Sequence, residues 1–500
     1  MISTAPPCHS APRTLSPVER HLMQHLPPLD DASLEAARQS AAPLAGRLGL
    51  GERLRSFTAH AWRGRTAGKP TLHLEDISAI PFVMDVPGVE EYQHRARIRA
   101  GDGDLFVTVT AAADGYERYC RDTLRLGAPE LLRAGGGGNP MQVARACSEG
   151  DTRSHLVARA RAAGGLCIHP YMGVEDVWEL AALVAAGSGA PVEVLGPPPP
   201  VTWVANDKAL FSEVVAAAIG RDWIVETTVS ADPAVLVDAL AATASRHRRV
   251  GVKRTRCASA MGNHVFLSAN LLAMDRPALR ATLDAFLART EWPPGEEVLV
   301  VAWEETDLSP STQLWIPPVG QGAPVLEGIY EQLLEGPEKV FVGSRPTTLP
   351  APVNERMGRA SVLVAAALQA LGYVGRCSFD LLVVGDPHGD FTLRFAECNG
   401  RWGGTSTPMH LVDRVAGAPR PTYRAQDVLH AGLRGASFTE VLASLGDSLW
   451  SPATRTGRFV VYNVGPLARR GKLDVVAFGE TPEAADEALL VELPRRLGLR

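Results

Sequence analysis

Strand-like and helix-like segments alternate between residues 70 and 195, and this alternation constrains the fold more than any other feature of the sequence. The runs TLHLED and DLFVTVT favour strands, and each is followed by a polar turn and a helix-like run. GGLCIHPYMGVEDVWELAALVAAGSGAPVEVLG then indicates strand, loop, helix and strand. Such alternation predicts a parallel sheet flanked by helices. The run GPPPP at 196–200 follows, and because proline disrupts both helices and strands, it predicts a domain boundary.

A chain of 500 residues is too long for one hydrophobic core, so two or three domains are expected. Beyond the proline run, helix-like and strand-like segments mix in a way that is typical of an α+β region. Two strand-like runs, GRFVVYNVG and LDVVAFG, precede a closing helix-like run. We therefore predict a flexible tail over residues 1–20, an α/β domain over 21–200, an α+β domain over 201–435 and a small α/β segment over 436–500.

The composition excludes several classes of protein. The net charge of −5 argues against a nucleic-acid binder that relies on overall positive charge. The cysteines are scattered without a CxxC motif, which favours reduced thiols in a cytoplasmic protein. The N-terminus lacks the pattern of a signal peptide, and no apolar run reaches the roughly 18 residues that a membrane span needs. We expect neither nucleic acid nor membrane as a partner.

The segment RCSFDLLVVGDPHGDFTLRFAECN predicts an antiparallel hairpin, because GDPHGD places turn residues between two apolar runs. Alternate side chains of a strand share a face, so Glu397 and Asn399 point to one side, as does Arg401 if the strand continues. Asp380 then falls opposite or diagonal to Glu397. Asp380, Glu397 and Asn399 are therefore expected to converge as oxygen ligands.

Such ligands suit Mg²⁺, which commonly takes one or two carboxylates together with phosphate oxygens. Arg401 adds a fixed positive fork for a phosphate or a developing oxyanion. Gly403 and Gly404 follow, and without a Cβ their N–H groups can approach an anion. The segment therefore indicates a site for a metal–polyphosphate complex. The alternative is a solvated strand face on which glutamate and arginine form a weak surface pair.

Lysine is rare in this chain, with five lysines among 50 basic residues, so its positions are informative. Lys208 begins a helix-like run just after the prolines, and Lys253 ends a short apolar strand. A loop of small residues that includes Ser259 and Ala260 follows Lys253. Such a loop can fold over a triphosphate while a lysine at its base supplies a point charge. The alternative is a solvated lysine beside an ordinary turn. Two further lysines are interpreted as surface residues: Lys339 and Lys472.

The apolar run EEVLVVAWEETD predicts a strand that ends in a tryptophan and three acids. Backbone groups at such a strand end can pair with an adenine edge, and one of the acids can accept from ribose hydroxyls. Which acid does so is left open, and strand-end acids that simply face water are the alternative. The candidate residues for nucleotide binding here are Trp303, Glu304, Glu305 and Asp307.

The order of these features resembles the ATP-grasp superfamily over residues 200–415. The first features are the helix that begins at Lys208 and the strand that ends at Lys253, with its loop of small residues. The strand end with acidic residues comes next, and the strand with Asp380 and the pattern Glu-x-Asn-x-Arg follow. VKRTRCASAMGNH is similar to the loop segment of the D-alanine–D-alanine ligase branch, although Ala258 replaces a common glycine and the usual proline after the lysine is missing. The resemblance implies a Rossmann-like pre-ATP-grasp domain over 21–200 and a two-subdomain ATP-grasp fold over 201–435.

The layout as a whole resembles the pheganomycin-type peptide ligases of natural-product pathways. This implies ATP and Mg²⁺ as cofactors, with a carboxylic acid and the amine of an amino acid or peptide as substrates, and a possible homodimer. It also implies that the acid is activated as an acyl phosphate and that an amine then displaces the phosphate. In this scheme Lys208, Lys253, Ser259 and Ala260 hold phosphates, while Asp380, Glu397 and Asn399 hold the metal. Two arginines would stabilise the oxyanion of the second step: Arg401 and Arg376.

Two other functions stay open at this point. An ATP-grasp enzyme can form an ester, a thioester or a carboxyphosphate instead of an amide. A phosphohistidine loop would favour that reading, but His169 and His264 are interpreted as loop or core residues. The second alternative is a nucleotide-binding protein that has lost turnover. It would be expected to have lost its metal ligands, and here all of them are present.

Overall fold

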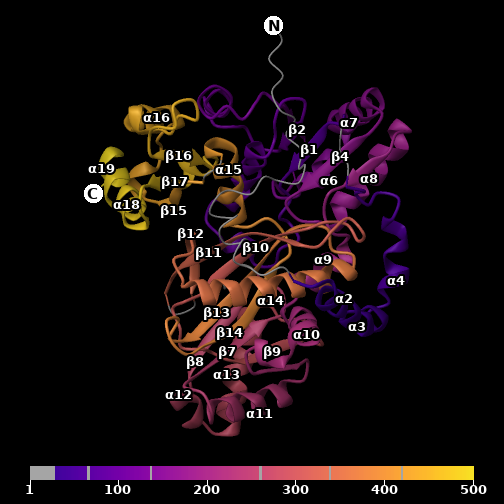
Figure 1. Cartoon of the computed structure of the whole chain (residues 1–500), viewed down its shortest axis with the longest axis vertical. Helices are drawn as coiled ribbons and strands as arrows, with labels where there is room; N and C mark the ends of the chain where they lie inside the picture. The colour runs from indigo at the N-terminus through magenta and orange to yellow at the C-terminus, as the bar shows by residue number, and fades with distance from the viewer. Residues whose placement is uncertain are drawn as a thin grey trace.

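The computed structural model describes residues 29–64, 68–135, 138–257, 262–336, 339–417 and 420–499, and these residues form three β-sheets (Figure 1). One sheet is parallel, and the other two are antiparallel. The α/β and α+β class predicted from the sequence is confirmed. The predicted tail over residues 1–20 lies outside the described residues.

The parallel sheet has the strand order β3-β2-β1-β4-β5, and each of its pairings is parallel, as the alternation predicted. The strands are β1 (Thr71–Leu74), β2 (Leu105–Thr108), β3 (Glu130–Arg133), β4 (Leu166–Pro170) and β5 (Val192–Val194). A long 3₁₀ segment, η3 (Val89–Ile98), lies between β1 and β2. The α-helices that accompany the sheet are α5 (Tyr116–Arg118), α6 (Val143–Cys147), α7 (Gly150–Ala163) and α8 (Glu175–Ser188).

The proline run begins a helix, which differs from the expectation that it would interrupt both helices and strands. Pro199 and Pro200 occupy the first turn of α9 (Pro199–Asn206). The first turn of a helix lacks partners for its N–H groups, so proline loses nothing there. The next helix, α10 (Lys208–Ile219), follows at once, and the Asp207 carboxylate caps it by accepting from two backbone N–H groups. The division of the chain into domains stays a prediction.

A small antiparallel sheet with the order β6-β9-β7-β8 carries three helices on one face (Figure 1). Leu240 and Leu283 from the helices pack on Val252 and Val300 from the strands. The strands are β6 (Thr227–Ser230), β7 (Arg249–Arg254), β8 (Asn263–Leu267) and β9 (Val298–Ala302). The helices are α11 (Pro233–Ala244), α12 (Ser268–Leu272) and α13 (Arg276–Arg289).

The large antiparallel sheet has the order β14-β13-β10-β11-β12-β15-β17-β16. The predicted hairpin is confirmed and forms its first two strands. The strands are β10 (Pro310–Ile316), β11 (Val325–Glu335), β12 (Val340–Pro346), β13 (Gly375–Gly385), β14 (Phe391–Asn399), β15 (Thr422–Leu429), β16 (Phe459–Tyr462) and β17 (Lys472–Gly479). The long helix α14 (Ala351–Ala370) packs on this sheet and on a helix from the start of the described chain, α2 (Asp31–Ser40).

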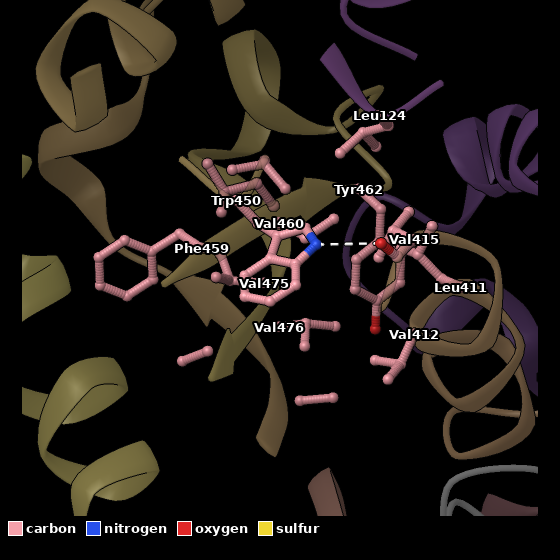
Figure 2. Packing of buried hydrophobic residues seen from close by; sticks show 14 of the residues in the cluster. Leu124, Leu411, Val412, Val415, Trp450, Phe459, Val460, Tyr462, Val475 and Val476 are labelled. Atoms are coloured by element: carbon pink, nitrogen blue, oxygen red, sulfur yellow. Dashed lines mark hydrogen bonds between the residues drawn. The ribbon is translucent and has the colours of Figure 1, made fainter. Parts of the chain in front are cut away.

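The C-terminal strands β16 and β17 join the same large sheet and share a core with α15 (Ser406–Ala416) (Figure 2). Trp450 lies in this core, and its indole N–H donates to the carbonyl of Val415 at 3.1 Å. The remaining α-helices are α3 (Ala42–Arg47), α4 (Leu50–Arg53), α16 (Phe438–Leu445), α17 (Leu467–Arg470), α18 (Pro482–Glu487) and α19 (Leu493–Arg496). No helix among the described residues is long and apolar enough to cross a membrane.

Candidate active site

A cavity of about 970 Å³ lies where the three sheets meet. One wall comes from the segment after β1 and from Tyr171 after β4, and a second comes from the small sheet, including Lys253 and Trp303. The face of the large sheet and the C-terminal segment complete the lining. The three sheets therefore enclose one shared space, large enough for a ligand of considerable size.

The hairpin brings the predicted metal ligands together at one end of this cavity. Asp380 on β13 lies directly opposite Glu397 on β14, and the pairing shifts register just after them. Asn399 donates from its amide nitrogen to the Asp380 carboxylate at 2.9 Å. All three side chains line the cavity. Their role as ligands stays a prediction, but the convergence on which it depends is present.

The two lysines approach these carboxylates from different sides. Lys208 begins α10 and is buried, with its Nζ 3.1 Å from Glu397 Oε2 and 3.2 Å from the Cys257 sulfur. It lines a small cavity behind Glu397 rather than the large one. Lys253 on β7 lines the large cavity, and its Nζ lies 5.0 Å from the centre of the Trp303 ring. Lys253 is thus placed to meet a ligand directly, whereas Lys208 neutralises Glu397.

The two carboxylates at this end differ in how readily they ionise. Burial and the neighbouring Glu397 carboxylate raise the pKa of Asp380 to about 7. Burial also acts on Glu397, but Lys208 and Lys253 outweigh it and hold the pKa of Glu397 below its usual value. Burial, with help from Lys208, lowers the pKa of Lys253. A carboxylate so reluctant to ionise gains from a metal ion beside it.

The donor set fits Mg²⁺. Asp380 and Glu397 supply carboxylate oxygens and Asn399 an amide oxygen, all of which are hard ligands. Within the described residues, no group of three or more His, Cys, Asp or Glu side chains is suited to hold a metal ion. An ion bound at Asp380, Glu397 and Asn399 would therefore take further ligands from outside this trio. Magnesium commonly fills the remaining positions with phosphate oxygens and water.

Arg401 lies beside this site and is held by Asn206, the last residue of α9. The Arg401 guanidinium donates to the Asn206 side-chain oxygen at 2.7 Å, and the Gly400 N–H donates to the same oxygen at 3.1 Å. Among the described residues, the buried Nε of Arg401 has no hydrogen-bond partner. Arg401 lines the cavity, and because an unpaired buried donor is costly, an anionic ligand that reached this N–H would be stabilised.

Arg376 is not brought to the cavity. Its guanidinium forms an ion pair with Glu327, with an N–O distance of 2.9 Å, and lies 4.6 Å from the centre of the Trp402 ring. Trp402 directly follows Arg401, and the backbone N–H of Trp402 donates to the Tyr171 carbonyl. Arg376 therefore supports the segment that carries Arg401, and nothing in its contacts places it on a reacting group.

The four residues that follow β9 and were predicted to bind the nucleotide separate into two groups. Trp303 and Glu304 line the cavity. Glu305 instead pairs with two arginines of the small sheet, and Asp307 pairs with Lys339. The side chain of Asp307 is 94% exposed. The structure thus places Trp303 and Glu304 at the cavity and leaves the other two acids on the surface. Ser259 and Ala260 lie outside the described residues.

Several residues around the site carried no signal in the sequence. Ser311 on β10 lies opposite Asp380 and lines the cavity, which becomes evident only from the pairing of β10 with β13. No sequence motif around Asn206 predicts its contact with Arg401. Lys472, interpreted as a surface lysine, is buried with 4% exposure and lines the cavity, so that interpretation was wrong. His169 lies in β4 with its ring against Trp402.

No protein-family model matches the sequence, and no curated protein matches it significantly. Solved structures resemble the fold. The biotin carboxylase domain of 2-oxoglutarate carboxylase from Hydrogenobacter thermophilus, in complex with MgADP, ADP and bicarbonate, is 12% identical with a TM-score of 0.49, and the match covers 84% of this chain and 88% of that one. N5-carboxyaminoimidazole ribonucleotide synthetase from Thermus thermophilus is 15% identical with a TM-score of 0.48, covering 86% and 98% of the two chains. At these values the likeness assigns neither a family nor an activity.

Proposed function

We propose that this protein is an ATP-dependent carboxylate–amine ligase of the ATP-grasp type, which forms an amide through an acyl phosphate and releases ADP. The observation that carries the proposal is the convergence of Asp380, Glu397 and Asn399 with Lys253 at one end of a large cavity. Carboxylate and amide oxygens beside a buried lysine suit a magnesium–polyphosphate ligand. In this proposal residues 21–200 form the pre-ATP-grasp domain and 201–435 the catalytic domain.

Different residues bind different parts of the nucleotide in this proposal. Asp380, Glu397 and Asn399 would hold Mg²⁺, which would supply positive charge to the phosphates. Lys253 holds a phosphate oxygen from the side of the small sheet. Lys208 favours the ionised form of Glu397, because its buried ammonium group lies 3.1 Å from the half-buried carboxylate. Trp303 and Glu304, at the end of β9, border the space for the base and ribose.

The chemistry then requires mainly positioning and charge neutralisation. An oxygen of the substrate carboxylate bonds to the γ-phosphorus while the bond to ADP breaks. The amine nitrogen next bonds to the acyl carbon, the carbon–oxygen bond to phosphate breaks, and the amine loses a proton to solvent or to the departing phosphate. Arg401 offers its buried, unpaired Nε–H to the oxyanion of this second step.

We further propose that the amine belongs to an amino acid or peptide and that the product serves natural-product biosynthesis. The resemblance of the sequence to the pheganomycin-type ligases motivates this step. The size of the cavity, about 970 Å³, supports it, because the lining continues well beyond the residues assigned to the nucleotide.

A panel of carboxylic acids and amines, each assayed for ADP release, tests the proposal. ADP is expected only when both an acid and an amine are present, and mass analysis should find the amide. With hydroxylamine as the amine, a hydroxamate should form from the acyl phosphate. Release of AMP and pyrophosphate would contradict the mechanism. An ester or thioester product would keep the nucleotide chemistry but replace the amide.

A further inference from the structure

The cavity has a second polar end, opposite the metal ligands. It crosses the face of the large sheet from β13 to β17, and the strands between them are β10, β11, β12 and β15. Five strand spacings of roughly 4.8 Å put the two ends at most about 24 Å apart, because the sheet curves between them. A nucleotide at the metal end leaves this far end to another ligand.

Lys472, the first residue of β17, forms part of the floor at this far end. Its Nζ lies 2.6 Å from the Tyr92 hydroxyl and 2.6 Å from Asp427 Oδ2. An ammonium group has three N–H donors, so one remains after these two contacts. Lys472 lines the cavity, as do Tyr92 and Asp427.

Arg95 on η3 supplies a second cation beside it. Its Nε and Nη2 both contact Glu75 Oε1, at 2.6 and 2.5 Å. Among the described residues no partner of its Nη1 is found, and Arg95 lines the cavity. The guanidinium carbon lies 4.1 Å from the centre of the Tyr92 ring. Arg95 and Lys472 therefore flank the same tyrosine and keep N–H donors for a ligand.

The carboxylates near this end are already engaged or hidden. Glu75 is held by Arg95, and Asp427 is held by Lys472. Asp474, opposite Asp427 on β17, is buried and does not line the cavity. Burial and the Asp427 carboxylate raise the pKa of Asp474 well above its usual value, which disfavours its charged form. The donors that remain open to the cavity favour an anion.

Apolar residues line the cavity on both sides of this end. Val83, Val86 and Val89 come from the segment after β1, and Leu489 and Leu490 come from the C-terminal segment. Walls of this kind accept the side chains or methylene groups of a ligand whose charged end lies on the floor.

We propose that Arg95 and Lys472 bind the terminal carboxylate of an extended peptide whose N-terminal amine reaches the metal end. The inference rests on the proposed ligase function and names its amine substrate. A peptide carries its reacting amine and its carboxylate at opposite ends, as the cavity requires. At roughly 3.3 Å per extended residue, a span of at most about 24 Å corresponds to no more than about seven residues. The alternative is that Lys472 and Tyr92 only tie the C-terminal strands to the segment after β1.

Binding measured without turnover separates these two readings. The probes are a seven-residue peptide of Gly, Ala and Leu with a free C-terminus and the same peptide as its C-terminal amide. Both are titrated into the full-length protein by calorimetry. The variants are Lys472→Met, which keeps the length of the side chain but removes its charge, and Lys69→Met as the matched control. Lys69 pairs with Glu193 and does not line the cavity.

The wild type and Lys69→Met are expected to bind the free acid about 10- to 100-fold more tightly than the amide, as loss of a charged hydrogen bond predicts. Lys472→Met should lose most of this preference, and Arg95 accounts for what remains. Equal affinities in the wild type, or no binding of the acid, would overturn the inference even if Lys472→Met fails to fold. An undiminished preference in a folded Lys472→Met would overturn it as well.

The assay also separates this inference from the ligase proposal. If no acid and amine pair yields ADP but the free acid still binds selectively, the ligase proposal fails and the carboxylate site stands. If amide formation occurs without any preference for the free acid, the ligase proposal stands and the carboxylate site fails.

Discussion

The two ends of the cavity are built from the same types of residue. At the metal end, Asp380 lies directly opposite Glu397, Lys208 pairs with Glu397 at 3.1 Å, and Asn399 donates to Asp380 at 2.9 Å. Two paired strands thus present two facing acids and one amide, and α10 supplies the lysine.

At the far end, Asp427 lies directly opposite Asp474, Lys472 pairs with Asp427 at 2.6 Å, and Asn463 donates to Asp474 at 2.9 Å. The difference lies in which atoms open onto the cavity. The metal end exposes its acids and amide and keeps Lys208 behind them, whereas the far end exposes Lys472 and hides Asp474 and Asn463. One set of residues therefore suits a cation at one end and an anion at the other.

The largest effect should come from removing a carboxylate at the metal end. Glu397→Gln is expected to lower ADP release on the order of a thousandfold, because it removes a metal ligand and leaves Lys208 without its counter-charge. Steady-state ADP assays measure this, with circular dichroism to check the fold. Glu193→Gln, which changes a carboxylate beside Lys69 and away from the cavity, serves as the control. Near-normal turnover in Glu397→Gln would contradict the assignment of Glu397 as a metal ligand.

Arg401→Ala should lower the turnover number by roughly 10²-fold, the usual cost of losing one oxyanion donor, with little change in ATP affinity. The expectation follows from its unpaired buried Nε beside the acids. Turnover number and ATP affinity are measured separately. A large loss of ATP affinity with unchanged turnover would instead place Arg401 on the phosphates.

Lys253→Ala should weaken ATP binding by about 10- to 100-fold, because a charged hydrogen bond to phosphate is lost. Lys208→Ala should also weaken it, by acting through Glu397. Lys69→Ala, which removes the partner of Glu193 away from the cavity, is the matched control. Calorimetric titration with ATP and Mg²⁺ provides the measurement. Equal and negligible effects in all three variants would mean that the metal end does not hold phosphates.

The smallest effect is expected at the hidden acid of the far end. Because the pKa of Asp474 is raised in the folded state, its protonated form is favoured there, and stability present at acidic pH is lost as pH rises through the folded pKa. Asp474→Asn mimics the protonated acid and should escape this loss. Its melting temperature should exceed that of the wild type by about 2 °C or more at neutral pH, with the difference shrinking toward pH 4. A difference that does not change with pH would show that Asp474 is ionised in the fold.

The metal end could be predicted from the sequence because its acids, its amide and Arg401 lie in one hairpin, where strand alternation fixes which side chains share a face. The far end could not, because Lys472 meets Tyr92 across 380 residues of chain. Local patterns contain no information on such a contact. The position of Ser311 beside Asp380 could not be predicted for the same reason, because β10 and β13 are far apart in the sequence and pair only in the folded sheet. The proline run was expected to interrupt helices and strands. Its last two prolines lie in the first turn of α9, where proline is tolerated, and composition alone does not distinguish these two positions.

The last strand of the sequence, β17, lies inside the large sheet, where it pairs with β15 on one side and β16 on the other. During synthesis on the ribosome, β15 keeps an unpaired edge until residue 479 has emerged. Unpaired edges are places where chains associate with one another. A nascent chain that stalls shortly before this point therefore carries an open edge in an otherwise nearly complete sheet, and such fragments should be substrates for chaperones and proteases.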